Sequence, residues 1–263
     1  MKKSYDYIIK LIKENNIKLV HLMFCDILSK LKDIAISPDS FIDAIENGVE
    51  INSNAISGFK NNNDSQLLIF PDPETISIIT YEEGVNSLLC YCDIKYSNGE
   101  NFKGDLRQLL RDTINSYKTQ ELEYKIGFGC EFYLFKLDEN GNETPIPYDD
   151  ASYLATPPDD KCLSIRRDIS NILNSIGIKT TMSYHAAGPA QNKMILECTD
   201  PLKAADNLLT FKFITNLVAQ SYKLHASFSP KPIKNRDGND LKINIELYKD
   251  NINILEFCDE RYT

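Results

Sequence analysis

Short apolar runs separated by polar turn residues dominate roughly the first 95 residues of the chain. The compact run Leu19–Phe24 is suited to a buried strand, and the second run Ile34–Ile36, reached through Asp26, predicts a hairpin. Two more strand-like runs follow at Thr75–Thr80 and Ser87–Ile94. A chain that begins this way predicts a unit built around a sheet rather than a helical bundle.

Helical patterns become frequent only after the polar tract Ser97–Glu100, which is the best candidate for a domain boundary. Ile126–Leu137 has the pattern of a long strand, whereas Asp200 followed by Pro201 is a strong helix start. The sequence therefore predicts an α+β chain of two domains, residues 1–98 and 99–263. Apolar residues alternate in the tail, as in a half-buried strand, at Ile243, Ile245 and Leu247.

Composition excludes several classes of protein. The 263 residues carry a formal net charge of −9, and an acidic surface disfavours nucleic acid as a partner. The sequence has no apolar run near the ~18–20 residues that span a bilayer, and its first residues lack a signal-peptide pattern. Seven dispersed cysteines indicate reduced thiols. We expect a cytoplasmic protein without a membrane partner.

The three histidines give no obvious catalytic group. His21 and His225 lie at strand-like runs and are interpreted as structural residues. His185 precedes a loop but has no cysteine or carboxylate close to it in the sequence, so it predicts neither a metal cluster nor a nucleophile–base pair. The acidic pairs Asp149–Asp150 and Asp159–Asp160 flank an irregular segment and are expected to be solvated.

Glu131 is the exception among the polar residues. It interrupts the apolar strand GFGCEFYLF, where an inward-facing carboxylate must be paired, protonated or bound to a cation. The sequence contains no glycine loop with the spacing of a known phosphate-binding motif.

Glu131 also lies within one of several tracts that resemble the bacterial type I glutamine synthetases. GCEFYLFKLDENG is similar to the metal-binding strand of that family, and NGVEINSNAISGF to its first active-site loop. The strongest similarities are RRDI (Arg166–Ile169) and the long colinear block Pro201–Pro232. The resemblance implies a small N-terminal β-grasp-like domain followed by part of the catalytic domain. Because it stops at Thr263, before the remaining family motifs, we expect a C-terminally truncated homologue.

The resemblance also implies a chemistry. The family ligates ammonia to glutamate through a γ-glutamyl phosphate, in glutamine biosynthesis and nitrogen metabolism, with ATP and Mg²⁺ or Mn²⁺ as cofactors. It assembles into stacked hexameric rings with active sites between subunits.

The positions that carry the family's chemistry are largely replaced. Of two acids on the metal-binding strand, one is Gly129 and the other is retained as Glu131. The other metal-ligand positions align with Ala186, Lys193 and Lys242.

Substrate positions are changed as well. The aspartate that helps to deprotonate ammonium aligns with Asn52, and an ATP-contacting glutamate aligns with Thr181. Asp237 and Gly238 stand at the glutamate-binding Asn-Gly pair, so Gly238 is a weak candidate for substrate binding.

These replacements predict that the chain is catalytically inactive by itself, because hard divalent cations need several oxygen ligands. We expect Glu131 to be paired with Lys193 or Lys242 instead of a metal ion, and we predict no bound cofactor. The chain would then act as a binding or regulatory partner, through self-association or association with a complete glutamine synthetase. The alternatives are a ligase subunit completed by another subunit, a small-molecule binder that keeps part of the pocket, and a gene remnant.

Overall fold

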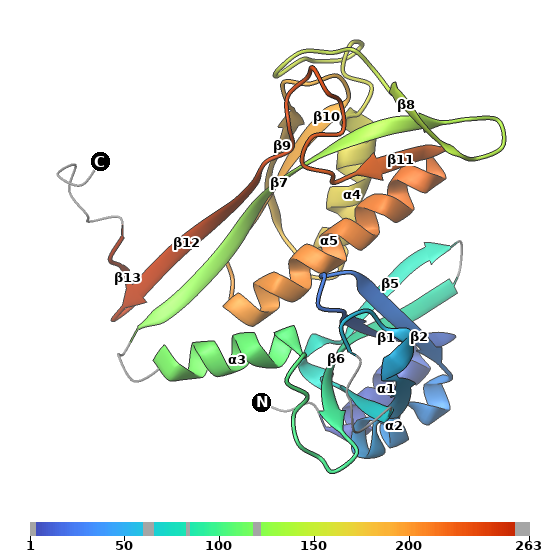
Figure 1. Cartoon of the computed structure of the whole chain (residues 1–263), viewed down its shortest axis with the longest axis vertical. Helices are drawn as coiled ribbons and strands as arrows, with labels where there is room; N and C mark the ends of the chain where they lie inside the picture. Colours follow the sequence, from blue (N-terminus) through green and yellow to red (C-terminus); the bar gives the residue numbers. More distant parts are fainter. Residues whose placement is uncertain (1–3, 60–65, 83–84, 118–121, 256–263) are drawn as a thin grey trace. The chain divides into compact units, whose positions relative to one another are not determined.

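The computed structural model describes residues 4–59, 66–82, 85–117 and 122–255 (Figure 1). The chain forms two compact units, residues 1–117 and 118–263. Of the helices in the described ranges, none combines the length and the apolar character needed to cross a lipid bilayer.

The first unit is built on a mixed sheet with the strand order β2-β1-β6-β4-β3, and β5 also pairs with β6. The predicted hairpin is present, because β1 pairs antiparallel with β2, while β1 and β6 run parallel. The strands of this unit are β1 (Leu19–Cys25), β2 (Leu31–Ile36), β3 (Val49–Asn52), β4 (Gln66–Pro71), β5 (Ser77–Glu82) and β6 (Val85–Tyr96).

Helices α1 (Tyr5–Glu14) and α2 (Phe41–Asn47) contribute Ile8 and Phe41 to the core of this unit. Asp105 fixes the start of α3 (Leu106–Tyr117) by accepting a hydrogen bond from the Arg107 backbone N–H.

The second unit is built around β7 (Glu123–Leu137), a long strand that pairs with four others. The sheet has the order β13-β12-β7-β10-β9, and β11 and β8 also pair with β7. The bounds of these strands are β8 (Glu143–Pro147), β9 (Thr180–His185), β10 (Gln191–Leu196), β11 (Leu224–Ser227), β12 (Leu241–Lys249) and β13 (Ile252–Asn253).

Two helices of the second unit, α4 (Leu163–Ser175) and α5 (Pro201–Ser221), pack against this sheet and against each other. The side chain of Asp200 caps α5 by accepting from the Leu202 and Lys203 backbone N–H groups, as the Asp-Pro pair predicts. Phe132 of β7 contacts Phe211 of α5, with ring centroids 6.0 Å apart. Because successive strand residues point to opposite faces, Glu131 projects from the face away from this contact.

Candidate functional site

Pairing in the second sheet places Glu131 directly opposite Lys193. β7 and β10 run antiparallel with Glu131 in register with Lys193, and β12 on the other side of β7 places Lys242 in register with Gly129. Residues two apart on a strand share a face, and opposed residues share it too. Four of the positions that the family resemblance assigns to metal binding therefore lie on one face of the sheet.

The carboxylate of Glu131 is engaged at both oxygens. Its Oε1 lies 3.1 Å from Nζ of Lys193, and the two side chains are 13% and 14% exposed. Its Oε2 accepts hydrogen bonds from the Asp240 backbone N–H at 2.9 Å and from Nε2 of Gln191 at 3.2 Å. The expected ion pair is present, and its cation is Lys193.

Lys193 is held as an ammonium group. Burial alone would lower its pKa, but the hydrogen bond to Glu131 and the charge of that carboxylate outweigh burial and raise the pKa above its ordinary value. Asp240 adds a second carboxylate, with Oδ2 3.5 Å from Lys193 Nζ. The positive charge at this face is therefore fixed by two acids at neutral pH.

Gly129 lies beside the side chains of two lysines. A Cβ atom added at Gly129 would lie 3.5 Å from Cε of Lys193 and 3.7 Å from Cβ of Lys242, while Lys242 itself is exposed. At this position, where the resemblance places a second acid, the nearest side chains thus include two lysines, which offer no oxygen ligand.

Ala186 and Thr181 belong to the β9 side of the sheet. Ala186 is buried directly after β9, and its backbone N–H donates to the Gln191 carbonyl at 2.7 Å. Thr181 is exposed and its hydroxyl donates to the Ile195 carbonyl at 3.3 Å. Neither side chain offers a carboxylate, and both residues serve the backbone of the β9–β10 pair.

The loop that carries Asp237 and Gly238 is fastened through its backbone. The Tyr133 hydroxyl donates to the Asp237 carbonyl at 2.7 Å, and Gln191 Nε2 donates to the Gly238 carbonyl at 2.9 Å. A Cβ atom at Gly238 would lie only 2.7 Å from the Pro230 carbonyl oxygen, so this close approach requires glycine. The backbone packing therefore explains why residue 238 is a glycine, without any role in substrate binding.

Asn52 lies at the end of β3 in the first unit. Its side chain accepts a hydrogen bond from the Asn54 backbone N–H at 3.0 Å, which caps a short 3₁₀ turn. It lines a polar recess together with Glu50, Asn54 and Gln66. An amide at this position cannot act as a base, and here it is used for a local turn.

A divalent cation does not fit the Glu131 face as it stands. Mg²⁺ and Mn²⁺ take about six oxygen ligands, chiefly carboxylates. On this face, in the described part of the chain, the acids next to Lys193 are Glu131 and Asp240, and both are ion-paired with its ammonium group. We therefore derive no step through a metal ion or a metal-bound nucleotide at this face.

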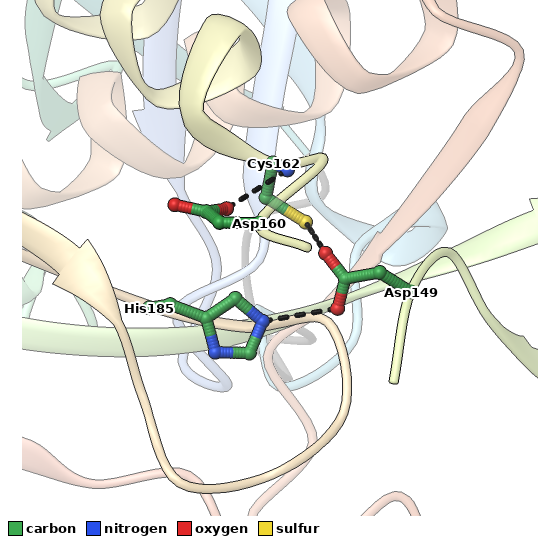
Figure 2. A group of neighbouring side chains, drawn as sticks. All are labelled: Asp149, Asp160, Cys162 and His185. Carbon is green, nitrogen blue, oxygen red and sulfur yellow. Dashed lines mark hydrogen bonds and ion pairs between the residues drawn. The ribbon is translucent and has the colours of Figure 1, made fainter. Parts of the chain in front are cut away.

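Asp149, Asp160, Cys162 and His185 form a second group of polar residues in the second unit (Figure 2). Their arrangement shows that the expectation for His185 is wrong. Its Nε2 lies 3.0 Å from Oδ1 of Asp149, and the Cys162 thiol donates to Oδ2 of the same carboxylate at 3.3 Å. His185 thus has a carboxylate and a cysteine beside it, which its sequence neighbours do not show. The expectation that Asp149 and Asp160 are solvated is also wrong, because both are buried. Their neighbours Asp150 and Asp159 are exposed.

Asp149 and Asp160 can be buried because each has buried hydrogen-bond or ion-pair partners. Asp149 also accepts from the backbone N–H groups of Ala190 at 2.8 Å and Lys161 at 3.1 Å. Asp160 forms an ion pair with Arg166, and both of these side chains are almost completely inaccessible. Arg166 in turn donates to the Asn192 side chain at 2.6 Å. The network ties the segment after β8 to α4 and to β10.

The protonation of the network follows from its hydrogen bonds. Burial alone would lower the pKa of His185, but the bonds to Asp149 and to the Ala186 carbonyl raise it above its ordinary value. Burial alone would raise the pKa of Asp149, but the bonds from His185 and from the backbone hold it far below its ordinary value. Both ring nitrogens of His185 thus face acceptors, Asp149 at 3.0 Å and the Ala186 carbonyl at 2.8 Å, and this arrangement favours the imidazolium form.

The same four side chains could in principle hold a metal ion, because one ligand atom of each lies within 4.8 Å of the others. The charges argue against it. Burial and the neighbouring Asp149 charge raise the pKa of the Cys162 thiol, and both ring nitrogens of His185 already face acceptors. Two carboxylates, one imidazolium and one guanidinium already balance. Metal binding would require the thiol and the imidazolium to lose protons. We interpret the group as a structural network.

Comparison with known proteins agrees with the fold and with the sequence tracts. Residues 16–97 match the model of the glutamine synthetase β-grasp domain, and residues 103–263 match the glutamine synthetase catalytic domain. A glutamine synthetase of Clostridium saccharobutylicum is 34% identical over 261 residues, covering 98% of this chain and 58% of the relative. One of Methanosarcina mazei is 32% identical over 248 residues, covering 94% of this chain and 56% of the relative.

A solved structure agrees as well. The cryo-EM structure of Plasmodium falciparum glutamine synthetase superposes with a TM-score of 0.85 at 24% identity, covering 96% of this chain and 55% of that one. The chain thus spans less than three fifths of the length of these relatives. Its two domain matches, in the order β-grasp then catalytic domain, show that the chain belongs to the glutamine synthetase family.

Proposed function

We propose that this chain is a glutamine synthetase family protein that does not ligate glutamate and ammonia by itself, and that it acts as a binding or regulatory partner. One observation carries the proposal: the acid retained from the family's metal-binding strand, Glu131, forms an ion pair with Lys193 at 3.1 Å. Lys193 stands where the resemblance places another metal-binding acid.

Electrostatics supports the loss of cation binding. Two like unit charges about 4 Å apart repel by roughly 4 kcal/mol at an effective dielectric constant of about 20, and a divalent ion doubles the effect. Each ~1.4 kcal/mol is about a factor of ten in a binding constant. The ammonium group of Lys193 lies within hydrogen-bond distance of Glu131. It would therefore lower the binding constant for Mg²⁺ or Mn²⁺ at this place by several orders of magnitude.

Phosphoryl transfer makes the same demand on the site. Metal ions and cationic side chains normally neutralise the charge that develops on the transferred phosphoryl group. Ala186 and Gly129 contribute no ligand, and Asn52 cannot serve as a general base. The substitutions in both units thus point to the same loss.

The partner in this proposal is a second copy of the chain or a complete glutamine synthetase. A partner that supplies the missing groups would make the chain a subunit of an active ligase, which is the competing function. The acid Glu131, retained on the strand that the resemblance assigns to metal binding, is the observation that favours this alternative.

The test measures ATP- and Mg²⁺-dependent γ-glutamyl transfer by the purified chain, alone and mixed with a complete glutamine synthetase. We expect no transfer by the chain alone, and in the mixture altered activity of the synthetase together with co-purification. Transfer by the chain alone that is lost in Glu131→Gln would overturn the proposal. New activity in the mixture that is lost when Glu131→Gln is introduced into this chain would favour the competing function.

A further inference from the structure

Helix α3, the last element of the first unit, has no strongly buried apolar face. None of its twelve residues, all of which the structure describes, is completely buried, and Leu109 and Tyr117 are 60% and 49% exposed. Isolated helices shorter than about 12–15 residues are marginal in water. Apolar burial therefore gives α3 little of the stability that a helix of this length needs.

Two arginines one turn apart, Arg107 and Arg111, connect α3 to the sheet of the first unit. Asp93 belongs to β6, and Asp72 directly follows β4. Nη2 of Arg107 lies 2.8 Å from Oδ2 of Asp72, and its Nη1 donates to Oδ1 of Asp93. Nη1 of Arg111 lies 2.8 Å from Oδ2 of Asp93, and its Nη2 lies 3.6 Å from Oδ2 of Asp72. Each arginine thus contacts both acids, and the four charges balance.

The surroundings of these four side chains strengthen their contacts. The Arg107 side chain is only 9% exposed, and those of the other three are half-buried. Charge-assisted hydrogen bonds from a guanidinium group to carboxylates are stronger than neutral ones. Ion pairs in full contact with solvent contribute little, and these pairs are not of that kind.

Without the two acids, the arginines would destabilise the helix. Like charges four residues apart on a helix repel each other. Asp72 and Asp93 compensate this repulsion only while α3 lies against the sheet. The helical order of α3 is therefore coupled to the ionic contacts.

The start of α3 is fixed independently of the arginine side chains. Phe102 is buried, and its N–H donates to the Ile94 carbonyl at 2.9 Å. Oδ2 of Asp105 accepts from the Ile94 N–H at 2.9 Å, and Oδ1 accepts from the Arg107 N–H at 2.9 Å. Loss of the ionic contacts would thus free the helix beyond this anchor and leave the anchor itself in place.

We propose that Arg107, Arg111, Asp72 and Asp93 form an ionic latch that keeps α3 helical and docked on the first unit. Opening this latch unfolds α3 while the sheet stays folded. The twelve residues span about 18 Å as a helix and up to about 40 Å when they are extended. The ionic latch therefore sets the reach of the segment that leads from the first unit to the second.

Hydrogen exchange of the full chain, followed by mass spectrometry, tests the ionic latch. The variant Arg107→Gln/Arg111→Gln removes both cations, and glutamine has nearly the helix propensity of arginine. We expect amide exchange in α3 to become about tenfold faster or more, while exchange in β1 stays within about twofold of wild type. If the arginines did not hold α3, the variant would lose only a repulsion, and its exchange would stay the same or become slower.

Two further variants serve as controls. Lys103→Gln removes an exposed cation just before α3, and Leu109→Ala removes an exposed apolar side chain from α3 itself. Both should leave exchange in α3 within about threefold of wild type. Unchanged exchange in the double arginine variant would overturn the proposal. An equal rise in Leu109→Ala would overturn it too, as would an equal rise in β1.

A mutant cycle and salt test whether the contacts are ionic. Asp93→Asn should also accelerate exchange in α3, but it should add little to the double arginine variant, because its partners are then absent. Salt at about 1 M, where the Debye length is about 3 Å, should accelerate exchange in wild type and not in the double arginine variant. Fully additive effects, or equal responses to salt, would contradict an ionic latch. None of these measurements depends on an enzymatic activity.

Discussion

Nζ of Lys193 lies 3.1 Å from Oε1 of Glu131, across the β7–β10 pair and on the face of the sheet opposite to the helices. The resemblance aligns this lysine with a family acid, and in this chain it neutralises the carboxylate of Glu131. The ion pair thus replaces the function that a bound cation would have for a nearly buried glutamate.

Removing the charge of Glu131 should cost stability. In Glu131→Gln, Lys193 keeps Asp240 as its remaining acid, and we expect a loss of about 1–2 kcal/mol in the free energy of unfolding. Urea denaturation measures this change. Glu139→Gln, on an exposed turn, is the matched control and should lie within about 0.5 kcal/mol of wild type. Equal stability of the two variants would show that the ion pair contributes nothing.

The Arg166–Asp160 pair should be much more sensitive than its neighbours. Arg166→Met leaves Asp160 buried without its cation, which typically costs about 3–5 kcal/mol. Arg167, the next residue, has a side chain that is 63% exposed, and Arg167→Met should change stability by less than about 0.5 kcal/mol. Thermal unfolding of both variants checks the prediction, and similar melting temperatures would contradict the buried network.

The imidazolium of His185 predicts a pH dependence with a defined sign. Because its folded pKa is raised, its stabilisation is complete below the ordinary value of 6.5 and is lost as pH rises through the folded pKa. Because the pKa of Asp149 is lowered, its contribution is present above the ordinary value of 3.8 and is lost as pH falls through the folded pKa. Arg166, Asp160 and the protonated Cys162 thiol are the other ionisable groups of this network.

The stability difference between wild type and His185→Gln should therefore be largest between about pH 4 and pH 6.5 and should shrink above it. Denaturation at a series of pH values measures this difference. The half-exposed His225, which pairs with Glu143 at 3.1 Å, supplies the control His225→Gln, with a difference that stays within about 0.5 kcal/mol. A pH-independent difference for His185→Gln would contradict the imidazolium.

Local patterns in the sequence predict the elements that depend on local signals. The Asp200–Pro201 start of α5 is present, because capping depends on neighbouring residues. β12 forms a strand at the expected place, but the expected half-burial of its apolar residues is wrong for Ile243 and Ile245, which are 55% and 56% exposed. β8 was not predicted, since Pro145 and Pro147 lack the N–H of an ordinary strand. β8 pairs along one side with β7, which is where proline is tolerated.

In the candidate site, too, local sequence signals identify some residues, whereas others depend on tertiary structure. Glu131 is recognisable as an acid inside an apolar strand, and the structure pairs it with a lysine 62 positions later through the strand register. Asp149 and Asp160 look like solvated loop acids, and their burial depends on His185 and Arg166, which tertiary structure brings to them. The buried Arg166 is the signal that could have pointed to an acid, because a guanidinium group in a core needs one.

Titration with Mn²⁺, followed by water-proton relaxation, tests most directly whether the Glu131 face can hold a cation. We expect no binding to wild type that is sensitive to Glu131→Gln. We expect gained binding in Lys193→Glu, which adds a carboxylate beside Glu131 and Asp240, and none in the control Lys193→Met, which removes the ammonium without adding a ligand. Stoichiometric Mn²⁺ binding by wild type that is abolished in Glu131→Gln would contradict the proposed loss of the metal site.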